Sequence, residues 1–174
     1  MVMTPRLRKF ALTVHLTCSV GWIGAVMAYL ALVVAAMTSQ DSRALQAVWI
    51  AMEVIGWYLI VPLALAALLS GLVMALGTPW GLFRHYWVLL SLVLTIFAAV
   101  VLLVHMQTVS DVARIAAETP SAALSGLPGE LVHAGGGMLV LLVIQVLNIY
   151  KPRGMTPYGQ RKRQGRRTVS PAET

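Results

Sequence analysis

Charged residues are scarce in this sequence, and the means of covalent cross-linking are almost absent. Charged side chains make up 11% of its 174 residues, against roughly 25% in a typical soluble domain. A single cysteine, Cys18, excludes a disulfide within the chain. The lack of charge excludes an ordinary water-soluble domain, and a hydrophobic content of 59% indicates an integral membrane protein surrounded by the lipid bilayer.

Common catalytic signatures are also missing. The sequence contains no Walker loop, no dinucleotide-binding fingerprint, no Ser/His/Asp order and no Cys-x-x-Cys pair. Hydrolysis and nucleotide chemistry are therefore not expected. Whether the protein is an enzyme stays open at this stage.

Four apolar runs are long enough to cross a bilayer, which requires about 20 residues each. We predict an all-α fold, an integral membrane four-helix bundle that occupies residues 1–150. Pro62 is expected to kink the second helix, because proline removes a backbone hydrogen bond. The expected helices, with their polar extensions, cover about residues 10–37, 44–76, 86–117 and 130–150.

Basic residues are distributed unevenly between the two ends of these helices. Of the 13 Lys and Arg residues, only Arg43 and Arg114 belong to one side, and the other eleven belong to the opposite side. Because Lys and Arg accumulate in cytoplasmic segments, both termini are predicted to be cytoplasmic. The basic tail, residues 151–174, is expected to be disordered and held near anionic lipid rather than bound to nucleic acid.

Two histidines are expected at a similar depth near the outer surface, since His105 ends the third apolar run and His133 begins the fourth. Two imidazoles from facing helices can occupy both axial positions of a haem iron. Gly136 and Gly137 would leave room for a flat cofactor, although each costs the helix about 1 kcal/mol relative to alanine. The sequence therefore predicts haem b held by this pair. In the alternative interpretation, the glycines only permit tight helix packing.

The other two histidines are expected toward the cytoplasmic side. His15 lies on a semi-polar stripe of the first helix, where it either becomes a further haem ligand or hydrogen-bonds a neighbour such as Ser70. His85 lies in GTPWGLFRHYW, a composition typical of an interfacial anchor. The twenty residues from His85 to His105 correspond to about 200° of helical rotation, so the two would face opposite sides. A second haem is therefore in doubt.

Carboxylates provide a competing, haem-free interpretation. Glu130 precedes His133 in the spacing Glu-x-x-His, and Glu53 is expected at the same outer level. Together with His105, these side chains could bind a divalent ion such as Zn, Mn or Fe. Glu130 could instead favour a helix N-terminus through the helix dipole, and Glu53 could carry protons or pair with Arg114.

Small residues recur at a spacing of four along the first two helices. Such pairs let helix backbones approach closely within a membrane. They leave open a different function, that of a non-enzymatic accessory or assembly subunit of a larger membrane complex, or assembly as a homo-oligomer. The pairs are Gly21 with Ala25, Gly24 with Ala28, and Ala67 with Gly71.

Two segments, KFALTVHLTCSVGWIGAVMAYLAL and GTPWGLFRHYWVLLSL, resemble a group of small uncharacterised bacterial four-helix membrane proteins. The arrangement of His15, Gly21 and Trp22 also resembles the first-helix pattern of copper-resistance-D-like and cytochrome-b561-like bundles. The resemblance implies a histidine-bearing bundle that binds haem in the bacterial inner membrane. We therefore expect a b-type cytochrome-like protein that passes electrons to or from quinone or a protein partner.

Overall fold

The computed structural model describes residues 3–78, 81–118 and 127–168. Within these residues the chain is α-helical with no strand, and four helices are long and apolar enough to cross a membrane. The predicted all-α membrane bundle is therefore confirmed. The elements are α1 (Pro5–Thr38), α2 (Ser42–Ile55), the π-helical turn η1 (Gly56–Ile60), α3 (Val61–Gly77), α4 (Tyr86–Glu118), α5 (Leu127–Tyr150) and α6 (Pro157–Thr168).

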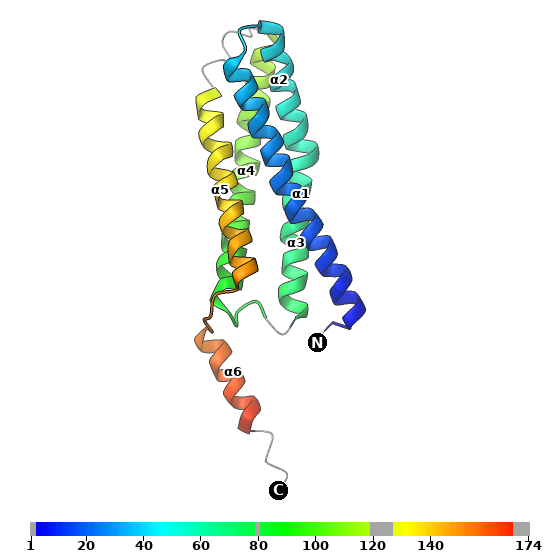
Figure 1. Ribbon diagram of the computed structural model, residues 1–174, viewed down its shortest axis with the longest axis vertical. Coiled ribbons are helices and arrows are strands. Elements are labelled where there is room, and N and C mark those ends of the chain that lie inside the picture. Colours follow the sequence, from blue (N-terminus) through cyan, green and yellow to red (C-terminus); the bar gives the residue numbers. More distant parts are fainter. Residues whose placement is uncertain (1–2, 79–80, 119–126, 169–174) are drawn as a thin grey trace.

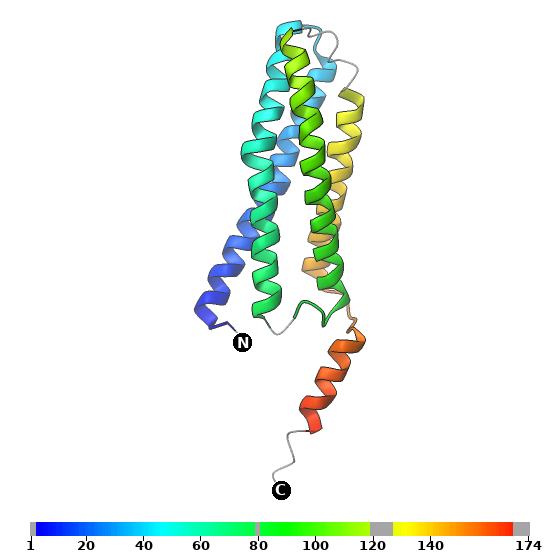
Figure 2. The same ribbon diagram turned by 180° about the vertical axis from the view of Figure 1, so that it is seen from behind.

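The four spans run side by side, and α2, η1 and α3 together form the second span (Figures 1 and 2). Both termini lie at the same end of the bundle (Figure 1). We call this the inner end, following the predicted orientation, and the opposite end the outer end. The first span begins at Pro5, earlier than the apolar run, because Thr4 caps it by accepting a hydrogen bond from the Leu7 N–H.

The most completely buried side chains lie toward the outer end, where α1, α2 and α4 pack together. Val33, Trp49, Met52 and Ala116 have no exposed surface. Burial of this kind is scarce elsewhere in the spans, because a membrane helix leaves much of its apolar surface for lipid. The packed outer end therefore provides a rigid support for the residues around it.

The second span contains a π-helical turn instead of a continuous α-helix. Pro62 follows this turn at the start of α3, and its missing N–H and bulky ring disturb the preceding backbone. A π turn accommodates such a disturbance within a helix. Gly56 begins the turn, and a Cβ there would overlap the side chain of Met106 on α4. The glycine thus lets the second span approach α4 closely.

The segment after α5 differs from the disordered tail expected from composition. Thr156 joins this segment to the connector before α4 by two hydrogen bonds. Its N–H donates to the Arg84 carbonyl oxygen at 3.0 Å, and its hydroxyl donates to the Phe83 carbonyl oxygen. The same hydroxyl oxygen accepts from the Gly159 N–H at 3.1 Å, which caps α6. Pro157 adds a favourable first residue. Residues 169–174 of the expected tail lie outside the described residues.

Candidate functional site

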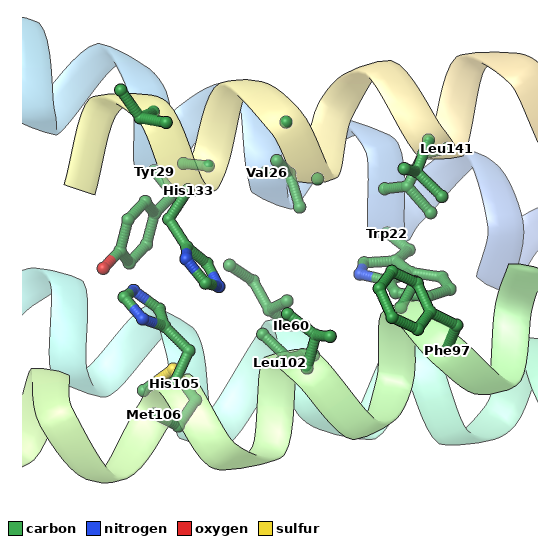
Figure 3. Close-up of a pocket in the computed structure, with 17 residues that line it drawn as sticks. Trp22, Val26, Tyr29, Ile60, Phe97, Leu102, His105, Met106, His133 and Leu141 are labelled. Carbon is green, nitrogen blue, oxygen red and sulfur yellow. The ribbon is translucent and has the colours of Figure 1, made fainter. Parts of the chain in front are cut away.

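His105 on α4 and His133 on α5 meet near the outer end of the bundle. Their rings stack with centroids 3.7 Å apart and planes inclined by 11° (Figure 3). The structure thus brings together the two imidazoles that the sequence placed at similar depth. Because the rings are in face-to-face contact, nothing lies between them.

Glu130, in the first turn of α5, holds one of these rings in place. Its side chain is only 4% exposed, and its Oε2 lies 3.0 Å from His105 Nε2. The same oxygen accepts a hydrogen bond from the Tyr29 hydroxyl of α1 at 2.7 Å. These contacts join α1, α4 and α5 through one carboxylate, and they offset the cost of burying it. A position near the start of a helix stabilises its negative charge further.

The carboxylate binds only one ring of the histidine pair. Glu130 contacts His105 directly, whereas His133 touches the carboxylate through no hydrogen bond among the described residues. His105 is therefore the anchored ring, and the more exposed His133 is the ring open to a ligand. A neutral imidazole carries a lone pair on one nitrogen.

An apolar pocket of about 360 Å³ extends from the histidines toward the middle of the bundle. Tyr29 and His105 lie at one end of the close-up view, and Trp22, Phe97 and Leu141 at the other (Figure 3). The His133 ring lies between these ends and is turned toward Ile60 and Leu102 (Figure 3). The remaining lining residues include Val26, Ala98, Val101, Met106, Ala134 and Val140.

The glycines of α5 open this pocket. Gly136 and Gly137 line it, and a Cβ added at Gly135, Gly136 or Gly137 would meet nothing within 4 Å. None of the three glycines is therefore in close contact with another described helix of this chain. Their missing side chains leave free space on the pocket side of α5.

The structure brings together part of the haem-free metal set. His105, Glu130 and His133 are neighbours, but none of the hydrogen bonds or ion pairs among the described residues joins Glu53 to them. Within the same residues, no group of three or more His, Cys, Asp or Glu side chains is arranged to hold a metal ion. Arg114 pairs with Asp111 at 3.2 Å rather than with Glu53.

The two remaining histidines lie away from this pair. His15 Nδ1 is 3.1 Å from Ser70 Oγ, so the predicted hydrogen bond between them is confirmed. His15 lines a different pocket near the inner end. His85 lies in the connector before α4, where it forms an isolated bridge with Met155 and its ring is 6.4 Å from that of Trp87.

Tyr29 is the site residue whose role the sequence did not reveal. The stripe of α1 that carries His15 also carries Tyr29, but its partner is separated from it by 101 positions. The sequence offered one indication of this role: Tyr29 places a phenol within the first span, and a buried hydroxyl requires a hydrogen-bond partner. Only the packing of α1 against α5 identifies that partner as Glu130.

The bundle, the apolar pocket and the histidine–carboxylate cluster, in which Glu130 is buried, His105 half-buried and His133 exposed, define a class, that of polytopic α-helical membrane proteins with a polar site between their spans. Residues 9–152 match the family described as predicted integral membrane protein (DUF2269), and the chain belongs to this family. No curated protein and no solved structure matches the chain. None of the comparisons supports the resemblance to copper-resistance-D-like or cytochrome-b561-like bundles.

Proposed function

We propose that the pocket between α1, α4 and α5 binds haem b and that the protein transfers electrons as a b-type cytochrome-like protein. One observation carries the proposal: an imidazole with a lone pair borders an apolar pocket whose α5 wall lacks side chains at Gly136 and Gly137. Haem needs an axial ligand, an apolar shell and clearance for a flat macrocycle. The three requirements coincide in this pocket.

The stacking of the two rings limits which histidine can hold a haem. A porphyrin cannot lie between imidazoles whose centroids are 3.7 Å apart, so the pair as arranged does not provide two opposed axial ligands. Both imidazoles line the pocket, but only His105 is bonded to Glu130, so His133 would hold the haem iron. His105 becomes a second ligand only if its ring turns away from the carboxylate.

The other side chains of the site act on the ligand and its surroundings. Glu130 and Tyr29 hold His105 against the His133 ring, much as carboxylates orient metal-bound histidines in other proteins. Trp22 and Phe97 supply apolar surface to the pocket, and an apolar shell tunes the reduction potential of a haem. The bound haem would supply the redox chemistry itself.

We also propose where the protein lies and with which molecules it exchanges electrons. We place the protein in the bacterial inner membrane with the inner end in the cytoplasm, because eleven of the 13 basic residues belong to that end. Electrons would pass to or from quinone or a partner protein.

A reduced-minus-oxidised absorption spectrum of the protein, purified in mild detergent, tests the proposal. The expected result is a Soret band and sharp visible bands on reduction. A colourless protein that remains colourless after incubation with hemin would contradict it. Elemental analysis of the same sample distinguishes the haem-free alternative, in which a divalent metal would be present in stoichiometric amount.

A second candidate function has its own observation. Gly24 and Ala28 are exposed on α1, and a Cβ at position 24 would meet nothing within 4 Å. Such a small-residue face suits close contact with a helix of another membrane protein or of a second copy. An accessory or assembly subunit would copurify with a larger partner and would carry no haem.

A further inference from the structure

A second pocket lies at the inner end of the bundle. Its volume is about 210 Å³, and no residue lines both pockets. Most of its wall is apolar, but polar side chains reach it from three helices and from the residues that follow α3 and α5. These are His15 of α1, Thr78, Thr95 of α4, Asn148 of α5 and Lys151.

Ser70 fixes the proton on the His15 ring. The Ser70 hydroxyl donates to the Ala66 carbonyl oxygen at 2.6 Å, and its Oγ lies 3.1 Å from His15 Nδ1. A serine hydroxyl has one proton, so the hydrogen between Ser70 and His15 comes from the imidazole. Nδ1 therefore carries the proton, and Nε2 of the neutral ring keeps its lone pair.

Gly71 fixes the position of the same ring. A Cβ at this residue would lie 3.0 Å from His15 Cε1, so the imidazole rests directly on the backbone of α3. The Ser70 contact uses Nδ1, and the backbone of Ala67 is a second hydrogen-bond partner of the ring. The inner pocket is thus lined by an imidazole that α3 holds in a fixed position.

We infer that the inner pocket binds the ring headgroup of a membrane-borne hydroquinone. The lone pair of a neutral His15 ring accepts from an O–H donor, and the positive charge of Lys151 in the same wall disfavours a cationic headgroup, so a neutral hydroxyl headgroup suits the pocket. Apolar walls that include Trp87 and Leu92 suit an aromatic ring, and the Asn148 amide can donate to a second oxygen on that ring.

A hydroquinone in this pocket would also serve the proposed haem protein as an electron donor. This role rests on the proposed function, whereas binding in the inner pocket does not. The two proposals can therefore fail separately.

Isothermal titration of the protein in lipid nanodiscs with duroquinol, kept reduced, tests the inference. His15→Phe retains a ring on Gly71 but removes the acceptor, so the affinity should fall roughly threefold to tenfold, the range expected for one hydrogen bond. Ser70→Ala should weaken binding less, because Nδ1 then no longer has a fixed proton. Thr13→Val, on the exposed side of the same helix, should bind duroquinol like the wild type.

Two further variants separate this inference from the haem proposal. His133→Ala should keep its affinity for duroquinol whether or not the protein binds haem. Gly137→Leu, which fills the outer pocket, should also leave the affinity unchanged. Wild-type affinity in a folded His15→Phe protein would overturn the inference, as would a loss of binding in Gly137→Leu.

Discussion

The imidazole rings of His105 and His133 lie face to face, with centroids 3.7 Å apart, although they belong to different spans. The contact is maintained from one side, because Glu130 and Tyr29 secure His105 while His133 borders the pocket. One ring therefore serves as a fixed support and the other is available to a ligand. This asymmetry leads to the predictions that follow.

Removing the Glu130 carboxylate should destabilise the bundle. Glu130→Leu leaves the Tyr29 hydroxyl and the His105 ring without their buried partner, so we expect a loss of about 2 to 4 kcal/mol in the free energy of unfolding. Glu130→Gln should cost less, because its amide oxygen still accepts the Tyr29 hydrogen bond. Unfolding by titration with denaturing detergent measures both. Asp111→Asn is the matched control, since that exposed ion pair should contribute less than about 1 kcal/mol.

Tyr29→Phe should have a smaller effect than Glu130→Leu. It removes one hydroxyl but leaves His105 bonded to the carboxylate, so we expect a loss of about 1 kcal/mol by the same unfolding measurement. A double variant with Glu130→Leu should lose less than the sum of the two single losses, because both changes remove the Tyr29–Glu130 hydrogen bond. Strict additivity would show that Tyr29 and Glu130 are not partners.

Gly56→Ala should destabilise the contact between the second span and α4. The added Cβ would overlap Met106, and overpacking of this kind costs typically about 1 to 3 kcal/mol. In a Met106→Ala background the same substitution should cost much less, because the obstructing side chain is gone. Unfolding free energies of the four proteins complete the cycle. An equal cost in both backgrounds would contradict the packing described for η1.

Gly137→Leu should abolish haem binding without unfolding the protein. The new side chain enters the open pocket rather than a packed interface, and replacing a helical glycine should raise helix stability by up to about 1 kcal/mol. The readout is haem content after incubation with hemin, alongside the unfolding free energy. Gly135→Leu is the matched control, because Gly135 is not among the residues that line the pocket and its added side chain also meets open space. Haem retained in Gly137→Leu would place the cofactor elsewhere.

The spans were predictable because a bilayer imposes length and apolarity on each helix separately. The meeting of His105 and His133 also followed from depth alone, since each lies near the same end of its span. Their stacking did not follow, nor did the Tyr29–Glu130 hydrogen bond, because both depend on how each helix is rotated against its neighbours. Packing between the helices sets their rotation, and so uniformly apolar a sequence does not reveal how the helices pack.

The tail and the glycines of α5 are two further features that composition alone did not settle. The basic composition of the tail predicted disorder, but Thr156 and Pro157 form a helix start that composition conceals. The three glycines of α5 indicated either packing or clearance, and the sequence could not decide between them. In the structure the space at their missing Cβ atoms is open, so they do not pack against another described helix of this chain.

Haem content per polypeptide in the wild type, His133→Ala and His85→Gln tests the central claim most directly. The wild type should bind haem after gentle extraction or reconstitution, and His85→Gln should bind as much, because His85 lies in the connector outside the pocket. His133→Ala should lose haem while it retains the fold. Equal haem in all three proteins, or none in the wild type, would contradict the account.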